Sequence, residues 1–316
     1  MTHPCMLCGS DHGSALFRGH DWLHNCEVAS DVIRCPECGL IWLWPQPASP
    51  LEGYPRDYAP HTGIEAATGV ARGPGHKRGL KRKVRLVERY GQGPLLDIGC
   101  AAGDFLEAMR DRRTGPLLGM DIDEDAVRLA RARSGARVWA GSELALPLDD
   151  SSMGTVTLWH VLEHLPRPLE ALCEVTRVLS GEGVLLLACP MADSYEARLF
   201  GRFWAGYDVP RHLFAFSRKT LPCLLKEAGL EPAEVRGVIY GYNSARLSSA
   251  FWLRHVSFFR DRPRWLHFAA ATLGACSALA CELLSRLLAN HRAVAVYVAR
   301  RAPNAQLGQL RCADRS

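Results

Sequence analysis

The sequence lacks several features that would place it in a specialised class. It contains no internal repeat and no low-complexity tract, and its 316 residues are 48% hydrophobic and 22% charged, which is ordinary for a globular protein with a sizeable core. Its first residues show no basic start followed by an apolar run, so we expect no secretory signal and a reducing cytosol. The net charge of +5 is a small excess and does not demand a polyanionic partner.

Long hydrophobic runs are also missing, with one near exception. Residues 265–281 carry no Asp, Glu, Lys or Arg, but this run is slightly shorter than the ~20 apolar residues that span a bilayer. The run belongs to an apolar, helical stretch over residues 244–290. Three interpretations of this insert stay open: a lid, a pair of helices lying on a membrane surface, and a spanning segment.

The order of segments indicates a small N-terminal module followed by one large α/β domain. We expect a module at 1–45, a linker at 46–75, the domain at 76–303 with its insert at 244–290, and a flexible tail at 304–316. Short apolar runs alternate with amphipathic stretches, which is typical of βαβ units and a mostly parallel sheet. We expect strands at 94–99, 116–121, 137–140, 155–160, 183–190, 231–239 and 293–299, and helices at 104–113, 124–134, 168–179 and 217–228.

Two Cys-x-x-Cys-Gly motifs lie near the N-terminus, and their cysteines are Cys5, Cys8, Cys35 and Cys38. Two such turns can direct four thiolates at one point, which is the closed tetrahedral geometry of a structural Zn²⁺ site without catalytic chemistry. The alternative is a set of redox-active or merely buried cysteines. His24 and Cys26 lie between the pairs, but their spacing fits a zinc site less well.

A glycine-rich turn follows the first expected strand of the α/β domain. It reads Asp97-Ile-Gly99-Cys-Ala101-Ala-Gly103-Asp104, and the next strand ends at Asp121, which is placed to accept the hydroxyls of a ribose. A dinucleotide would need a third glycine at residue 104, and the carboxylate there would repel its pyrophosphate. S-adenosylmethionine has no phosphate, and its sulfonium and amino groups suit the Asp97 carboxylate. A tight turn that binds no ligand is the alternative.

Four blocks resemble the class I S-adenosylmethionine-dependent methyltransferases, in the subgroup that includes ubiquinone-pathway O-methyltransferases. They begin at Leu96, Leu146, Val161 and Arg177, and read LDIGCAAG, LPLDDSS, VLEHL and RVLSGEGVLL. The resemblance covers residues 76–240. It implies a Rossmann-like class I methyltransferase sheet with an antiparallel last strand.

The resemblance also implies residue roles. Gly99, Ala101 and Gly103 would line the methionine part of the donor and Asp121 would hold the ribose, while Ser142 and Glu143 would flank the adenine and His160 would lie near the sulfonium. Two positions depart from the family pattern, which has Gly at residue 101 and Asp at residue 154, where this chain has Ala101 and Gly154.

The N-terminal module also carries a resemblance. Together with the block from Tyr54 to Tyr58, it is similar to the zinc-binding region of sugar C-methyltransferases and related methyltransferases of glycan clusters. The C-terminal domain of those proteins is not recognisable in this sequence.

A loop rich in aromatic residues follows the fifth expected strand, over residues 200–217. Parallel α/β sheets bind ligands at the carboxyl ends of their strands, so we expect this loop to cover the methyl acceptor. Histidine is the side chain that commonly exchanges a proton near neutral pH, so His212 is the candidate general base, with Tyr207 or Asp208 orienting it or the substrate. The alternative is that His212 only ties the loop to its domain by a hydrogen bond. We expect His164, in a helix-start motif, to be structural.

These patterns favour a methyltransferase that acts on oxygen or carbon of a small hydroxylated acceptor, such as a sugar, a glycan or a lipid-linked precursor. We expect a cytoplasmic protein with possible peripheral contact to the inner face of the membrane through residues 244–290. An RNA base methyltransferase is the rival enzyme, against which the modest charge and the apolar insert argue. A non-catalytic zinc adaptor is the third interpretation.

Overall fold

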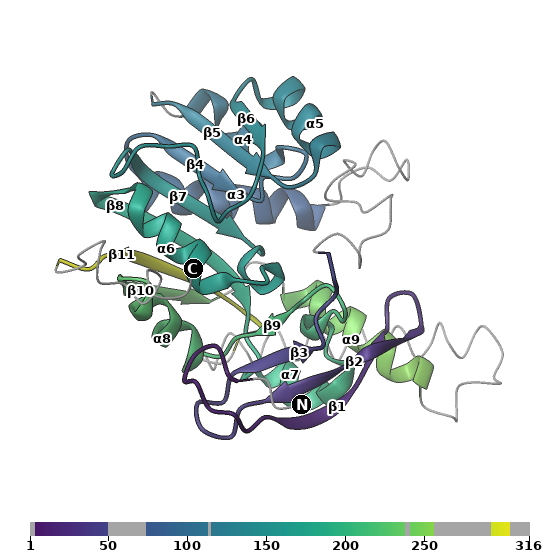
Figure 1. Cartoon of the computed structure of the whole chain (residues 1–316). Coiled ribbons are helices and arrows are strands. Elements are labelled where there is room, and N and C mark those ends of the chain that lie inside the picture. Colours follow the sequence, from purple (N-terminus) through teal and green to yellow (C-terminus); the bar gives the residue numbers. More distant parts are fainter. Residues whose placement is uncertain (1–3, 50–73, 113–114, 238–240, 256–291, 304–316) are drawn as a thin grey trace. The chain divides into compact units, whose positions relative to one another are not determined.

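The computed structural model describes residues 4–49, 74–112, 115–237, 241–255 and 292–303 (Figure 1). Contacts within the chain divide it into two compact units. The first unit joins Met1–Gly53, Cys189–Leu221 and Gly237–Ala295, and the second joins Tyr54–Ala188, Pro222–Arg236 and Val296–Ser316. Each unit is described by itself.

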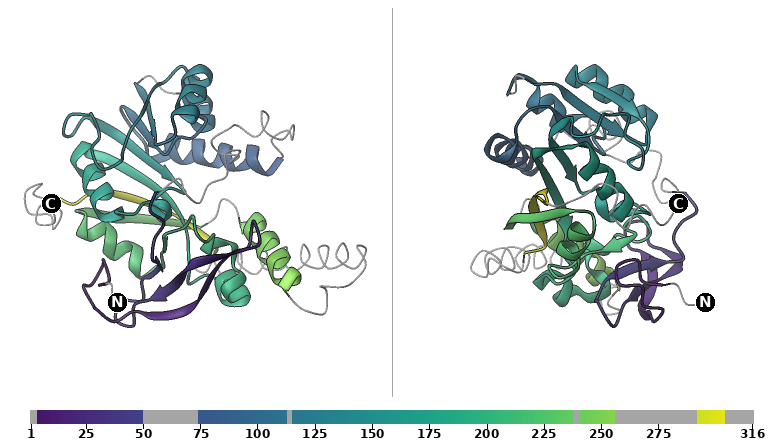
Figure 2. Two further views of the ribbon diagram at one scale, coloured as in Figure 1. Left: turned by 45° about the vertical axis from the view of Figure 1, so that its right-hand side comes forward. Right: turned by 60° about the vertical axis from the view of Figure 1, so that its left-hand side comes forward.

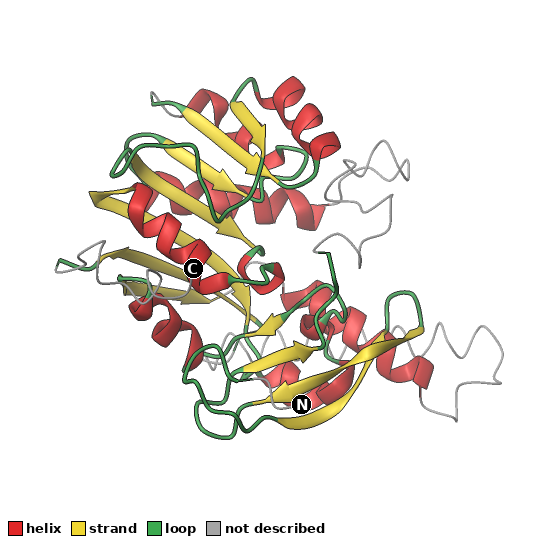
Figure 3. Cartoon of the chain, in the orientation of Figure 1, coloured by secondary structure: helices red, strands yellow, loops and turns green. Residues whose placement is uncertain are grey.

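The second unit is built on a seven-stranded sheet of order β10-β11-β8-β7-β4-β5-β6 (Figure 3). The strands β4 to β8 pair in parallel. Met191 N–H, just after β8, donates to the carbonyl of Ala293, just before β11, so these two strands run in opposite directions. The strands are β4 (Leu95–Ile98), β5 (Leu117–Asp121), β6 (Arg137–Ala140), β7 (Met153–Trp159), β8 (Leu179–Pro190), β10 (Leu230–Gly237) and β11 (Val294–Arg301). The predicted Rossmann-like sheet with an antiparallel last strand is confirmed.

Helices cover both faces of this sheet, with α6 in front of it and α3 behind it in Figure 1. The local sequence sets both ends of α5. The Asp123 side chain accepts a hydrogen bond from Ala126 N–H at its start, and Gly135 takes a φ of 66° at its end. The helices are α3 (Pro74–Tyr90), α4 (Asp104–Met109), α5 (Glu124–Ser134), α6 (Pro168–Val178) and α8 (Thr220–Glu227), with 3-10 turns η1 (Arg110–Arg112) and η2 (Leu162–His164).

The first unit is built on an antiparallel sheet of order β1-β2-β3-β9. Its fourth strand, β9 (Phe214–Ala215), comes from the segment after β8 and pairs with Ile41 and Trp42 of β3. The other strands are β1 (Ser14–Asp21), β2 (Cys26–Arg34) and β3 (Ile41–Trp44), and the helices are α7 (Tyr195–Phe200) and α9 (Gly241–His255), with η3 (Gly201–Phe203) and η4 (Ala205–Tyr207) (Figure 2).

A small core holds the helical part of the first unit together. Trp204 is 1% exposed and packs with Ala197, Phe200 and Ala245 from α7 and α9. The Ser248 hydroxyl accepts from Ala205 N–H at 2.8 Å, which fixes α9 to the turn η4. The segment expected to cover the acceptor therefore folds together with the N-terminal module.

Contacts thus group the chain differently from the segments expected from sequence. The strand β3 (Ile41–Trp44) has unpaired backbone groups along one edge, and β9, from a distant part of the chain, pairs with this edge. Most of the expected linker, most of the insert at 244–290 and the whole of the expected tail lie outside the described residues. Within the described part of the chain, no helix is long and apolar enough to cross a bilayer.

Candidate functional site

The turn between β4 and α4 is the first candidate for donor binding. Gly99, Ala101 and Gly103 all have positive φ angles, of 67°, 47° and 81°. A Cβ at Gly99 would lie 2.4 Å from Val161 Cγ2, and one at Gly103 would lie 2.8 Å from Ala130 Cα. Both glycines are therefore required by backbone conformation and by close packing inside the second unit.

Ala101 is the one residue of this turn that pays a conformational penalty, because its side chain disfavours the left-handed region. We expect Ala101→Gly to raise the free energy of unfolding by about 1 kcal/mol, since glycine adopts this φ without steric cost. Urea unfolding monitored by fluorescence measures the change. A lower stability would show that the alanine methyl group makes packing contacts that outweigh the backbone strain.

Asp121, at the end of β5, holds the turn in place. One of its oxygens accepts from Ala101 N–H at 2.8 Å, and the other accepts from Asp123 N–H at 3.0 Å. The residue is 4% exposed. Each carboxylate oxygen keeps a second lone pair, so the group can accept further hydrogen bonds from ribose hydroxyls at a fixed position.

Asp97 lies at the carboxyl end of β4 and is 2% exposed. Thr157 of the neighbouring strand donates its hydroxyl to Asp97 Oδ1 at 2.6 Å. Burial raises the pKa of Asp97 to about 7, although Thr157 and Lys83 both favour the ionised form. A cationic group of a ligand would stabilise the ionised form of this buried carboxylate. This agrees with the expected role of Asp97 in binding the cationic methyl donor.

The remaining expected donor residues lie in the same unit. His160 follows β7 with a φ of 61°, and its Nδ1 lies 3.2 Å from Oε1 of Glu163, which is 1% exposed. Ser142 and Glu143 follow β6; the Ser142 hydroxyl accepts from Leu144 N–H at 3.2 Å, and burial raises the pKa of Glu143.

The structure accounts for glycine at residue 154. A Cβ there would lie 2.2 Å from the carbonyl oxygen of Gln92, in the turn that leads into β4. This departure from the family pattern is therefore a packing feature and does not alter the donor residues.

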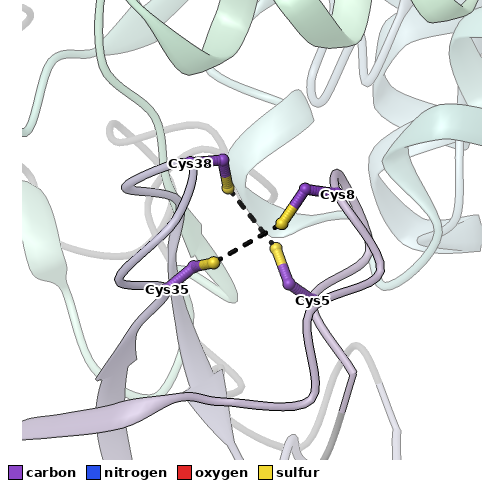
Figure 4. A group of neighbouring side chains, drawn as sticks. All are labelled: Cys5, Cys8, Cys35 and Cys38. Atoms are coloured by element: carbon purple, nitrogen blue, oxygen red, sulfur yellow. Dashed lines mark hydrogen bonds between the residues drawn. The ribbon is translucent and has the colours of Figure 1, made fainter.

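The four cysteines of the N-terminal motifs converge in the first unit (Figure 4). The two turns have the same backbone hydrogen bonds: Gly9 N–H donates to the Cys5 carbonyl, and Gly39 N–H donates to the Cys35 carbonyl. Both glycines have positive φ, of 74° and 84°. This repeated turn geometry presents two thiols from each motif to a common centre.

The spacing of the sulfur atoms fits a tetrahedral metal site. Cys5 Sγ lies 3.5 Å from Cys38 Sγ, and Cys8 Sγ lies 3.5 Å from Cys35 Sγ, while all four lie within 4.8 Å of one another. Zinc–sulfur bonds of ~2.3 Å in a tetrahedron require sulfur–sulfur distances of about 3.8 Å. His24 is engaged elsewhere, with Nδ1 2.8 Å from Asp21 Oδ2, and Cys26 is exposed at the start of β2.

A buried ion pair connects the N-terminal sheet to the expected acceptor segment within the first unit. The Arg211 guanidinium is 0% exposed and donates to both oxygens of Asp21, at 2.9 and 3.1 Å. It also donates to both oxygens of Asp208, at 3.0 and 2.6 Å. Asp208 therefore serves mainly as a partner of Arg211.

We expect Asp21→Asn to destabilise the first unit by about 1.5–3 kcal/mol, because it removes a charged hydrogen-bond acceptor from a buried guanidinium. Burial raises the pKa of Asp21, but hydrogen bonds from Arg211 and His24 outweigh this and lower it to about 2. The stabilisation is therefore present at neutral pH and lost as the pH falls from about 4 towards 2.

Thermal unfolding across this pH range measures the effect. Asp31→Asn is the matched control, because Asp31 forms an exposed pair with Arg18 on the same sheet, and such pairs contribute about 0–1 kcal/mol. Equal losses for the two variants would contradict a special role for the buried pair.

His212 is held in a defined orientation. Its Nδ1 lies 2.8 Å from the carbonyl oxygen of Gly206, so Nδ1 carries the proton and Nε2 is the basic nitrogen. Nε2 lies 4.0 Å from Asp208 Oδ2. Tyr207 packs edge-on against Phe17 and Trp204, and burial raises its pKa, so its hydroxyl stays protonated.

Sequence reasoning missed two features of these sites. Nothing in the sequence pairs Arg211 with Asp21, since the two residues are far apart in the chain and belong to no shared motif. Lys83 belongs to the basic helix α3, yet it is only partly exposed and lies over the Trp159 ring. The alternation of buried Val84 and Val87 with basic residues was the available signal.

A parallel sheet with its last strand antiparallel, a glycine turn after the first strand and an acidic residue ending the second define a class I S-adenosylmethionine-dependent methyltransferase. A family model described as a methyltransferase domain matches residues 76–235, and the chain belongs to this family.

Named relatives agree with this class. A protein of Mycolicibacterium smegmatis, described as a probable S-adenosylmethionine-dependent methyltransferase, is 30% identical over 171 residues, covering 52% of this chain and 62% of the relative. The matched region thus spans less than two thirds of that relative. The ubiquinone biosynthesis O-methyltransferase of Methylococcus capsulatus is 28% identical over 182 residues, covering 52% and 75% of the two chains.

Solved structures support the fold alone. A chain from the complex of the Haloferax volcanii Trm112 methyltransferase activator with a methyltransferase has a TM-score of 0.50 and 17% identity, and covers 73% of this chain and 92% of that one.

Proposed function

We propose that the chain transfers a methyl group from S-adenosylmethionine to an oxygen or carbon atom of a small hydroxylated acceptor, such as a sugar, a glycan or a lipid-linked precursor. The observation that carries the proposal is the hydrogen bond between His212 Nδ1 and the Gly206 carbonyl. It leaves Nε2 as a base. A base is needed when the atom that receives the methyl group carries a proton, as hydroxyl and activated C–H groups do.

The chemistry assigns each site a separate task. The acceptor atom attacks the methyl carbon, the carbon–sulfur bond breaks and its electron pair stays on sulfur, giving S-adenosylhomocysteine. The acceptor proton passes to His212 Nε2. Asp97, Asp121 and the turn from Gly99 to Gly103 hold the donor, and the rate then depends on aligning the acceptor with the methyl group.

Two resemblances support the choice of acceptor. The Methylococcus capsulatus relative is named as an O-methyltransferase of ubiquinone biosynthesis, which favours a hydroxyl group as the target. The N-terminal module is similar to that of sugar C-methyltransferases, which favours a carbohydrate. The two kinds of enzyme have a small hydroxylated acceptor in common, and they differ in whether oxygen or carbon receives the methyl group.

We further propose that Cys5, Cys8, Cys35 and Cys38 hold a structural Zn²⁺. The twin turns and the sulfur spacing support this assignment. Four protein ligands complete a tetrahedron and leave no position for substrate, so the ion would stabilise the fold and take no part in the reaction. Its place in the same unit as His212 would make it a support for the acceptor segment.

Peripheral contact with a membrane remains part of the proposal for residues 244–290. Only the first part of this stretch lies among the described residues, in α9, where Trp252 is 47% exposed. An exposed tryptophan suits a membrane interface.

The test is methyl transfer from isotopically labelled S-adenosylmethionine to a panel of acceptors. The panel contains nucleotide sugars, polyprenyl-linked sugars, hydroquinones and total RNA, with mass spectrometry to locate the label. Label on oxygen or carbon of a sugar or hydroquinone supports the proposal. Label on RNA bases alone would replace it by the RNA methyltransferase interpretation, and a folded chain that neither binds the donor nor transfers its methyl group would favour the zinc adaptor.

A further inference from the structure

The donor region of the second unit contains three carboxylates and one lysine in its surroundings, and their partners differ. Asp104 is already paired, with His76 Nε2 at 3.1 Å and Arg133 at 2.7 Å. Asp97 accepts from Thr157, and Asp121 accepts two backbone N–H groups. Lys83, on α3, has neither a hydrogen bond nor an ion pair with any residue in the described part of the chain.

The Lys83 side chain nevertheless lies against the sheet, over the ring of Trp159. Its ammonium lies 5.3 Å from the centre of the Trp159 ring, a cation–π contact on the side of the sheet where Thr157 meets Asp97. Burial lowers the pKa of Lys83 to about 8, even though Asp97 and Asp104 act in the opposite direction. A nearby anion stabilises the charged form of a buried ammonium more than that of an ammonium on the surface.

Trp159 supplies a second hydrogen-bond donor. It is the last residue of β7 and is 7% exposed. The residue before it, Leu158, pairs with Ile98 at the end of β4. Its ring is held edge-on against Phe105 of α4, with centroids 5.5 Å apart. The indole Nε1–H is buried and has no acceptor among the described residues. Leaving a buried donor unsatisfied is unfavourable, so a ligand acceptor would be favoured.

The proposed donor has the complementary charges. Its methionine end is a zwitterion, with an α-ammonium and an α-carboxylate on the same carbon atom. Asp97 suits the α-ammonium, and a carboxylate on that carbon then needs a cation and a hydrogen-bond donor nearby. We propose that Lys83 and Trp159 bind the α-carboxylate of S-adenosylmethionine, the first by charge and the second through its indole N–H. This inference rests on the proposed function, because it assumes that donor.

The other interpretation of Lys83 is that it only balances the charge of Asp97. That interpretation does not explain the unpartnered Trp159 N–H, and it predicts no dependence on the ligand carboxylate. Decarboxylated S-adenosylmethionine separates the two, because it keeps the sulfonium and the ammonium and lacks only the carboxylate.

Calorimetry with both compounds is the experiment. Wild-type protein is expected to bind S-adenosylmethionine about 10- to 100-fold more tightly than the decarboxylated compound, the range of a charge-assisted hydrogen bond. Lys83→Met should remove most of this preference by weakening only the carboxylated ligand. Trp159→Phe should reduce it by about 3- to 10-fold. Lys81→Met, at an exposed position on the same helix, is the control and should change nothing.

The possible outcomes separate the inference from the function on which it rests. A Lys83→Met variant that keeps the wild-type preference, or that binds both compounds equally less tightly than wild type does, overturns the carboxylate assignment. Wild-type binding without any preference overturns it as well and leaves the donor proposal standing. If wild-type protein binds neither compound, the proposed function itself fails.

Discussion

Replacement of His212 by asparagine is expected to lower the rate of methyl transfer by about 10²- to 10⁴-fold and to leave donor binding unchanged. The asparagine amide can still donate to the Gly206 carbonyl, as His212 Nδ1 does at 2.8 Å, so the segment keeps its tie. The variant lacks the second ring nitrogen, so no base remains to take the acceptor proton. Single-turnover kinetics with the acceptor found in the panel, together with calorimetry of donor binding, measure the two effects.

A structural role for His212 predicts a different pattern. If the imidazole only ties the segment to Gly206, the His212→Asn variant should retain most of its activity, and His212→Ala should lose stability and activity together. Full activity of His212→Asn would therefore contradict the base assignment. Rescue of the alanine variant by added imidazole would support it, because an external base does not restore a lost hydrogen bond to the backbone.

Removal of zinc is expected to unfold the first unit and to spare donor binding. Structural Zn²⁺ sites contribute about 10–16 kcal/mol of apparent binding free energy, far more than the free energy of unfolding of a typical domain. Chelation, or Cys38→Ser, should therefore abolish the cooperative unfolding of the unit that holds β1, β2, β3 and β9. The donor residues belong to the second unit, which has its own sheet.

Metal analysis of the purified protein, followed by calorimetric unfolding with and without chelator, tests this expectation. Cys26→Ser is the matched control, since Cys26 is exposed and lies outside the cluster of four sulfur atoms. One zinc per chain in wild type and in Cys26→Ser, with loss in Cys38→Ser, is the expected result. If the protein contains no metal and its unfolding is the same with and without chelator, the cysteines would instead be redox-active or simply buried.

The parts of the fold that could be predicted are those set by local chemistry. The helix α5 begins and ends where the sequence indicated, because Asp123 caps its start and Gly135 takes a left-handed conformation at its end. The turn after β4 was recognisable because Gly99 and Gly103 are needed where a side chain would collide with Val161 and Ala130. The N-terminal cysteine motifs were recognisable because both cysteines of each turn lie within four residues.

The parts that could not be predicted depend on contacts between distant residues. The strand β9 is two residues long and has no periodicity of its own, so its pairing with Ile41 and Trp42 left no pattern in the sequence. The orientation of Lys83 depends on the rotation of α3 about its axis, and its neighbours in sequence are mostly solvated. The four hydrogen bonds that Arg211 donates to Asp21 and Asp208 depend on the folding of two distant segments onto each other, which no local pattern indicates.

The central claim is that the second unit binds S-adenosylmethionine in the turn between β4 and α4. Calorimetric titration of the full chain with S-adenosylhomocysteine, the product that the reaction would leave in the site, tests it most directly. We expect binding of one ligand per chain and a large loss of affinity in Asp121→Ala, which removes the proposed acceptor of the ribose hydroxyls and the hydrogen bond to Ala101 N–H. No binding to a folded wild-type chain, or equal binding by the folded variant, would contradict it.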